Sequence, residues 1–287
     1  MEERIILPDT NREMHFYSWG TERGSVPNKL YLAIHGLMMH GRSFERLAQR
    51  LASDGAVVVA PDIRGFGKHY FQEGSRRQPR EVDYKGSLED LNALMKLLKE
   101  RYSDSETAFV CLGESLGAHM ARRLATMHPD LISALILSSP CIRPRMVSLP
   151  LIPHALTSLI QIGLDPRKEI DLAPFARRFL RDEPESLEAF LADPMNRKSL
   201  EVSELLKSVL VVNACQLMSI SPAVPVLVLR GEKDCVCKAA STKKFLDSLR
   251  TDRIVVKEIS GSGHLLLQGG EPKEEVVDAI TSFVRNN

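Results

Sequence analysis

The chain has 287 residues, enough for one large α/β domain with an insertion or for two modest domains. A hydrophobic fraction of 44% and mixed charges are typical of a globular protein. The formal net charge of +1 gives no reason to expect nucleic-acid binding, and no apolar run approaches the roughly 20 residues that span a bilayer.

Two local features fit this picture of an ordinary globular chain. The densest basic run, at residues 76–80, is brief and lacks interleaved aromatic residues, so we expect a solvated loop and no phosphate-binding patch. No basic region followed by a long apolar core stands at the N-terminus, so we expect no secretory signal and a cytoplasmic location.

Cysteine usage also indicates a reducing compartment. The number is odd and the positions are scattered, which argues against a disulfide framework. Cys235 and Cys237 match neither the usual zinc spacing nor the two-residue redox motif, so we interpret them as small apolar side chains. The five cysteines are Cys111, Cys141, Cys215, Cys235 and Cys237.

The first elements along the chain are two strands, at residues 4–7 and 14–19, with a turn at 8–11 that predicts an antiparallel hairpin. Short runs rich in Val, Ile and Leu then recur, and they are typical of parallel strands buried on both faces. These runs are residues 30–34, 56–60, 108–112, 134–137, 224–229 and 254–259.

Helical patterns lie between or after these runs, which predicts a doubly wound, mostly parallel sheet. Ser87 and Asp90 resemble a capping box at the start of the second helix. The four expected helices are residues 43–53, 88–102, 116–127 and 274–284.

Residues 141–221 interrupt this alternation, since we find only helical patterns there and no convincing strand. Such an excursion predicts a helical cap between a first core part, residues 1–140, and a second, residues 222–287. The cap would lie between strands 6 and 7. Its apolar stripes either pack onto the core, which we favour, or contact a membrane interface. The stripes are Ile152, Leu156, Leu159 and Ile160; Leu172, Phe175, Ala176, Phe179 and Leu180; and Val202, Leu205, Leu206, Val209 and Leu210.

A nucleophile motif stands between an expected strand and an expected helix. Gly113-Glu114-Ser115-Leu116-Gly117 fits the pattern Gly-x-Ser-x-Gly, in which a sharp turn exposes the serine hydroxyl. Gly113 and Gly117 are the small residues that such a tight turn needs. The helix N-terminus behind Ser115 would also stabilise a developing oxyanion. We therefore expect Ser115 to be a nucleophile.

A serine nucleophile needs a base and an acid that orients it, and in this arrangement they follow the serine along the chain. Asp234 follows the run at 224–229, and His264 follows the run at 254–259. Glu232 comes sooner after its strand, and Asp252 precedes a strand, so we favour Asp234 as the acid. Structural or surface roles are expected for the other histidines, which are His15, His35, His40, His69, His119, His128 and His154.

An oxyanion hole is expected where the run at 30–34 enters His35-Gly36-Leu37. Gly36 would let the backbone approach the substrate, and the amides of Leu37 and Leu116 would be the donors. Gly65-Phe66-Gly67 lacks the third glycine of a nucleotide loop, and the sequence has no Walker loop or paired zinc ligands. We therefore expect no cofactor and no metal.

Together these motifs make the chain similar to one family of the α/β-hydrolase superfamily. It resembles monoacylglycerol lipases, lysophospholipases and related esterases of the serine aminopeptidase S33 type. The resemblance implies a sheet of about eight strands, a helical lid and a hydrophobic acyl pocket. The chain departs from many relatives at Ala118, at Lys68-His69 and at the two cysteines after Asp234. The matching stretches are residues 35–37, 40–44, 61–67, 113–117, 193–195, 225–234 and 263–264.

The expected activity is hydrolysis of a carboxylic ester with an apolar acyl group, through an acyl-Ser115 intermediate. The partner would be a small ester, without nucleic acid and without stable membrane insertion. The same three side chains could cleave amides or carbon–carbon bonds, or transfer the acyl group to another alcohol. A non-catalytic binding protein on the same fold is the alternative from a different class.

Overall fold

The computed structural model describes residues 1–7, 12–20, 27–71, 81–102, 107–140, 165–180, 183–215, 218–237 and 239–287. Several features predicted from the sequence lie outside these ranges. They are the turn at residues 8–11, the basic run at 76–80, Cys141, His154 and the first apolar stripe of the cap.

A mixed sheet forms the centre of the molecule, with the strand order β1-β2-β4-β3-β5-β6-β9-β10. Strand β2 pairs in antiparallel fashion with β1 and β4, and all other neighbours in this sheet are parallel. This confirms the predicted mostly parallel sheet of eight strands. The strands are β1 (Glu2–Leu7), β2 (Arg12–Trp19), β3 (Lys29–Ile34), β4 (Ala56–Pro61), β5 (Ala108–Glu114), β6 (Ala134–Ser138), β9 (Val226–Gly231) and β10 (Ile254–Ile259).

Burial distinguishes the inner strands from the edge strand β10. Strands β3, β4, β5, β6 and β9 are buried almost throughout, as runs of Val, Ile and Leu predict. The same expectation is wrong for β10, where Val255 and Val256 are 51% and 45% exposed. Strand β10 has a neighbour on one side only, since it ends the sheet, and solvent reaches the side chains there.

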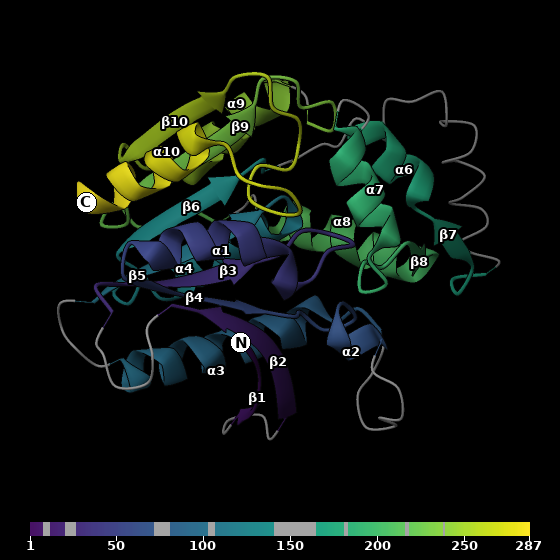
Figure 1. Cartoon of the computed structure of the whole chain (residues 1–287), viewed down its shortest axis with the longest axis horizontal. Helices are drawn as coiled ribbons and strands as arrows, with labels where there is room; N and C mark the ends of the chain where they lie inside the picture. Colours follow the sequence, from purple (N-terminus) through teal and green to yellow (C-terminus); the bar gives the residue numbers. More distant parts are fainter. Residues whose placement is uncertain are drawn as a thin grey trace.

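Helices cover both faces of the sheet (Figure 1). Helices α1 and α10 share one apolar core with the sheet, whereas α3, α4 and α9 share a second core on the opposite face. This arrangement confirms the doubly wound architecture. The bounds of the helices are η1 (Gly41–Phe44), α1 (Glu45–Ser53), α2 (Lys68–Phe71), α3 (Tyr84–Arg101), α4 (Leu116–Met127), α9 (Ala239–Leu249) and α10 (Glu274–Arg285).

Helix α3 begins four residues before the predicted start, so the expected capping box is wrong. Asp83 is the N-cap, and its side chain accepts a hydrogen bond from the Gly86 amide. Ser87 and Asp90 lie inside the helix and are buried. Both bind Arg64. Ser87 Oγ accepts from the backbone amide of Arg64, and Asp90 accepts from its guanidinium, which needs a charge partner because it is buried.

The segment between β6 and β9 contains both helices and strands, and it is called the cap segment below. The expectation that it holds no strand is wrong, since β7 and β8 form a small antiparallel sheet with Ile170 opposite Leu200. Each strand has three residues, too few for an alternating pattern to identify it. The described elements are β7 (Glu169–Asp171), α6 (Ala173–Phe179), α7 (Pro184–Ala192), β8 (Ser199–Glu201) and α8 (Val202–Cys215).

The two described stripes of the cap segment pack differently. Leu172, Ala176, Phe179 and Leu180 of the second stripe are buried in the same core cluster as helices α3 and α4. The third stripe, on α8, is exposed at three positions, so the expectation that it packs inward is wrong there. Helix α8 instead directs its Ser208, Val211 and Cys215 face inward. The exposed positions are Leu206, Val209 and Leu210, at 42%, 52% and 59%.

The strand order creates a switch point beside β3. The chain passes from β3 to β4 on one side and then returns to β5 on the other side. The loops that follow β3 and β5 therefore leave adjacent strand ends, where ligands bind in open α/β sheets. Among the described helices, none combines the length and the apolar character that crossing a membrane requires.

Candidate active site

The nucleophile motif forms a sharp turn between β5 and α4. Ser115 has φ +54° and ψ −113°, a backbone conformation that non-glycine residues rarely adopt. A Cβ atom at Gly113 would collide with the carbonyl oxygen of Gly117, and one at Gly117 would collide with that of Ile34. Both glycines are thus required by close backbone approach, and α4 packs tightly against the end of β3.

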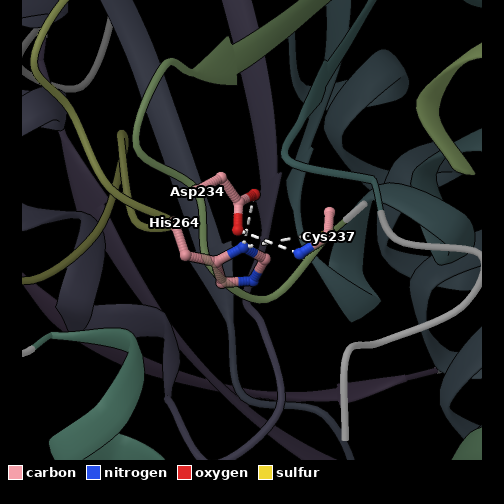
Figure 2. Close-up of side chains that lie close together, drawn as sticks. All are labelled: Asp234, Cys237 and His264. Atoms are coloured by element: carbon pink, nitrogen blue, oxygen red, sulfur yellow. Dashed lines mark hydrogen bonds and ion pairs between the residues drawn. The ribbon is translucent and has the colours of Figure 1, made fainter. Parts of the chain in front are cut away.

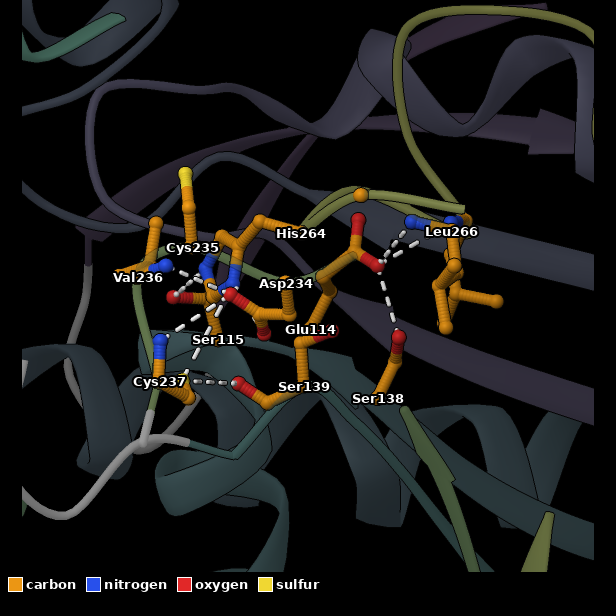
Figure 3. A network of polar contacts seen from close by, with 12 residues as sticks. Glu114, Ser115, Ser138, Ser139, Asp234, Cys235, Val236, Cys237, His264 and Leu266 are labelled. Carbon is orange, nitrogen blue, oxygen red and sulfur yellow. Dashed lines mark hydrogen bonds and ion pairs between the residues drawn. The ribbon is translucent and has the colours of Figure 1, made fainter. Parts of the chain in front are cut away.

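Three predicted residues meet at this turn, each from a loop after a parallel strand. His264 Nε2 lies 3.0 Å from Ser115 Oγ (Figure 3), and His264 Nδ1 lies 2.9 Å from Asp234 Oδ2 (Figure 2). The side chains of His264 and Asp234 are 5% and 8% exposed. The geometry is within the reach that proton transfer from a serine hydroxyl requires.

The environment of Asp234 determines which nitrogen of His264 bears the proton. Burial raises the pKa of Asp234, but the nearby His264 and the amides of Val236 and Cys237 outweigh it, so this pKa lies below its ordinary value. Asp234 is therefore an ionised acceptor at neutral pH. Because Nδ1 must donate to it, Nε2 is left to accept the proton of Ser115.

The two rival carboxylates make no contact with the imidazole. Glu232 is exposed, and its Oε2 accepts a hydrogen bond from the Gly261 amide at 2.7 Å. Asp252 is exposed and precedes β10, at the strand end away from His264.

His35 fixes the loop after β3 through both ring nitrogens. Nδ1 lies 2.9 Å from the carbonyl oxygen of Gly36, and the Ile63 amide donates to Nε2 at 3.1 Å. Complete burial lowers the pKa of His35 to about 4, so the ring is neutral near pH 7. A neutral ring with Nδ1–H as donor and Nε2 as acceptor satisfies both contacts.

The predicted oxyanion donors lie on either side of Ser115. A Cβ atom at Gly36 would lie 3.5 Å from Ser115 Cβ, so the loop after β3 passes directly beside the serine. Leu37 follows in that loop, and Leu116 begins α4. Within the described ranges, neither amide donates a backbone hydrogen bond, which leaves both available to a substrate oxygen.

Gln268 is a residue of this site that the sequence did not single out. Its Oε1 accepts a hydrogen bond from the Gly36 amide at 3.0 Å, although the two residues are 232 positions apart. Its side chain therefore connects the loop after His264 with the loop that presents Leu37. A single glutamine after a histidine has no distinctive spacing, so no pattern could have identified it.

The cap segment contacts the same loop through residues 193–197. His40 Nε2 lies 2.9 Å from Asp193 Oδ2, and the Arg197 amide donates to the Met38 carbonyl at 2.8 Å. Burial raises the pKa of Asp193, but hydrogen bonds from His40 and the Met195 amide hold it below its ordinary value. The resemblance at residues 193–195 thus marks a contact between cap segment and core.

One aromatic side chain of the cap segment, Phe179, lies against His264. The ring centroids of Phe179 and His264 are 6.0 Å apart, and Phe179 also packs against Phe175 and Phe190. Phe179 shields the imidazole from water on that side. Other described histidines lie elsewhere: the ring of His15 packs edge-on against His69, and that of His119 against Phe245.

One group of side chains could in principle ligate a metal ion. Asp234, Cys237 and His264 each have a ligand atom within 4.8 Å of the others, and Cys237 Sγ is 4.0 Å from His264 Nδ1 (Figure 2). A metal at Nδ1 would require that nitrogen to be unprotonated, which removes its hydrogen bond to Asp234. The arrangement therefore fits proton transfer better than metal binding.

Comparisons with known structures agree with this architecture. A soluble variant of monoglyceride lipase from Saccharomyces cerevisiae superimposes with a TM-score of 0.76 at 17% identity, covering 95% of this chain and 90% of the other. A carboxyl esterase from Bacillus coagulans gives 0.75 at 20% identity, covering 100% and 98%. The fold is that of α/β-hydrolases.

Sequence comparison identifies the family. A monoacylglycerol lipase of Mycolicibacterium smegmatis is 23% identical over 261 residues, which are 90% of this chain and 88% of that protein. The family model described as serine aminopeptidase, S33, matches residues 25–273. Since this match spans most of the sequence, the chain belongs to the serine aminopeptidase, S33, family of hydrolases.

Proposed function

We propose that the protein hydrolyses carboxylic esters with an apolar acyl group, through an acyl-Ser115 intermediate. The observation that supports this most directly is the continuous chain of hydrogen bonds from Ser115 through His264 to Asp234. A serine hydroxyl is a weak nucleophile near neutral pH, and such a chain is the means of activating it.

In the first half-reaction, Ser115 Oγ attacks the ester carbonyl while His264 Nε2 takes its proton. Asp234 stabilises the resulting imidazolium, and the amides of Leu37 and Leu116 donate to the oxyanion. Each such donor contributes about 3 kcal/mol to transition-state stabilisation. His264 then protonates the departing alcohol, which leaves the acyl group on Ser115.

In the second half-reaction, water attacks the acyl-Ser115 carbonyl while His264 removes its proton. The same amides bind the second oxyanion, and return of the proton to Ser115 releases the carboxylic acid. Phe179 keeps bulk water from one side of His264, which strengthens the charge interactions of the imidazole in both steps.

Two observations favour an ester substrate over the peptide bond that an aminopeptidase cleaves. Lipases and an esterase are among the proteins similar to this chain. The cap residue that lies against His264, Phe179, is also aromatic, whereas an aminopeptidase must bind a charged amine. Burial of Cys111 and Cys215 without disulfides supports the further proposal of a reducing, cytoplasmic location.

The test is hydrolysis of short and medium-chain esters by wild type and S115A, together with labelling by a fluorophosphonate probe. We expect S115A to fold normally, to resist labelling and to lose turnover by about a millionfold. The matched control is S139A, since Ser139 is a buried serine outside the chain of hydrogen bonds from Ser115 through His264 to Asp234. The turnover of S139A should stay within about threefold of wild type, as for other small changes outside the site. Wild-type esterase activity in S115A would refute the proposal.

A further inference from the structure

The carboxyl group of Glu114, one residue before Ser115, takes no part in the reaction described above. It is fully buried at the end of β5. Its Oε1 accepts three hydrogen bonds: from Ser138 Oγ at 2.7 Å, from the Leu266 amide at 2.7 Å and from the Leu267 amide at 3.1 Å (Figure 3). One oxygen atom therefore connects β5, β6 and the loop after β10.

Those contacts bear directly on His264. Leu266 and Leu267 are the second and third residues after it, so Glu114 fixes the backbone on its C-terminal side. Asp234 fixes only the ring, through Nδ1. A shift of about 1 Å at a reacting group can reduce the rate about 100-fold, so the position of this backbone matters for the reaction.

We propose that Glu114, in its ionised form, is a positioning residue for His264. It holds the segment after His264 against β5, so that Nε2 stays within hydrogen-bonding distance of Ser115. The proposal rests on the catalytic roles proposed above for Ser115 and His264.

The environment of Glu114 explains why an ionised carboxylate matters there. Burial raises the pKa of Glu114 to about 7, against the opposing effects of its three donors and of His264. Oε2 has no hydrogen-bond partner among the described residues. His264 is the titratable side chain that acts on it, since the groups facing it from β6 and the loop, Ser138 and two amides, are uncharged.

The direction of the pH effect follows from this pKa. Above pH 7 the carboxylate accepts charge-assisted hydrogen bonds, which are roughly twice as strong as neutral ones. It also stabilises the imidazolium that forms in the transition state. Below pH 7 the group becomes neutral, so its bonds to Leu266 and Leu267 weaken.

Three variants separate positioning from general packing. E114Q keeps an acceptor oxygen without the charge, E114L removes both, and S138A removes one bond to Oε1 without altering the loop after His264. We would measure kcat and KM with an ester, and the rate of fluorophosphonate labelling, between pH 5 and 9. Labelling requires only a competent Ser115 and His264, so it does not depend on the choice of substrate.

We expect folded E114L to lose about 100-fold in kcat with little change in KM. E114Q should be about tenfold slower than wild type above pH 8 and should converge with it below pH 6. S138A should keep kcat within about threefold of wild type above pH 8, but its rate should begin to fall at a higher pH, because Ser138 is one of the groups that lower the pKa of Glu114.

Folded E114L with wild-type kcat would overturn the proposal, and so would E114Q with the wild-type rate at every pH. The second criterion decides the matter if E114L does not fold. Wild type that neither labels nor hydrolyses esters would instead contradict the proposed function.

Discussion

Asp234 and Glu232 lie two residues apart in one loop, but they have different partners. Asp234 accepts from His264 Nδ1, whereas Glu232 accepts from the Gly261 amide. In D234N the amide can donate to Nδ1, which favours the wrong tautomer of His264. We expect kcat to fall about 10⁴-fold, with the fold intact.

The control for this prediction is E232Q, measured with the same ester at the same pH. Its amide oxygen can still accept from Gly261, so kcat should remain within about threefold. Comparable losses in the two variants would mean that the loop conformation, and not the Asp234 carboxylate, determines the rate.

At the residue scale, the sequence located the groups that motifs and strand order define. The Gly-x-Ser-x-Gly pattern predicted Ser115 as the nucleophile. The strands before Asp234 and His264 predicted these two residues as the acid and the base. Glu114 and Gln268 were not identified, because each acts through a contact with a residue more than 150 positions away. Such contacts depend on the folded arrangement of loops, which no local pattern encodes.

At the scale of elements, a buried ion pair within the cap segment fixes helix α8 to Arg197, which in turn contacts the loop after β4. Arg197 binds Glu204 of α8, donates to the Gly65 carbonyl and lies 4.0 Å over the ring of Tyr70. Glu204 also accepts from the Val82 amide. Removal of the carboxylate leaves a buried guanidinium unpaired, so E204L should lower the free energy of unfolding by about 3–5 kcal/mol.

The matched control lies on the same helix. Lys207 and Glu81 form an exposed ion pair at 3.8 Å, and K207A should cost less than about 1 kcal/mol. Urea unfolding curves of wild type, E204L and K207A provide the measurement. An E204L midpoint equal to that of K207A would show that the buried pair contributes no more than a surface pair.

Elements were predictable where their residues are buried and their pattern is long. Helix α4 begins and ends at the residues that the sequence predicts. Helix α9 was not identified, and β7 and β8 were too short to recognise. The burial of the third stripe, on α8, was predicted wrongly for another reason. Apolar periodicity predicts that a helix face is buried but cannot say which neighbour covers it.

At the scale of the whole molecule, the cap segment shares one apolar core with the large sheet and the helices on one of its faces. Leu172, Phe179 and Phe190 belong to the same cluster as residues of β3, β5 and α4. The cap segment therefore contributes to the stability of the protein as well as to its site. Phe179 belongs to this core and also lies against His264, so the shape of the acyl site depends on the packing of both parts.

This arrangement leads to a prediction about substrate choice. An apolar cover over His264 favours an aliphatic chain, and each methylene buried contributes about 0.8 kcal/mol. Specificity measured as kcat/KM should therefore rise about fourfold per methylene from acetyl toward medium chains, until the site is full. Peptides would require polar partners for their charged amine.

The measurement compares acetyl, butyryl, octanoyl and palmitoyl esters, monoacylglycerols and aminoacyl amides, with S115A as the blank. F179S provides a variant in which the cover over His264 becomes smaller and polar, so its rise with chain length should be shallower than that of wild type. A flat profile across the esters would contradict the apolar acyl site. Turnover confined to aminoacyl amides would identify a peptidase. Binding of the charged amine would then contribute more to kcat/KM than burial of the acyl methylenes.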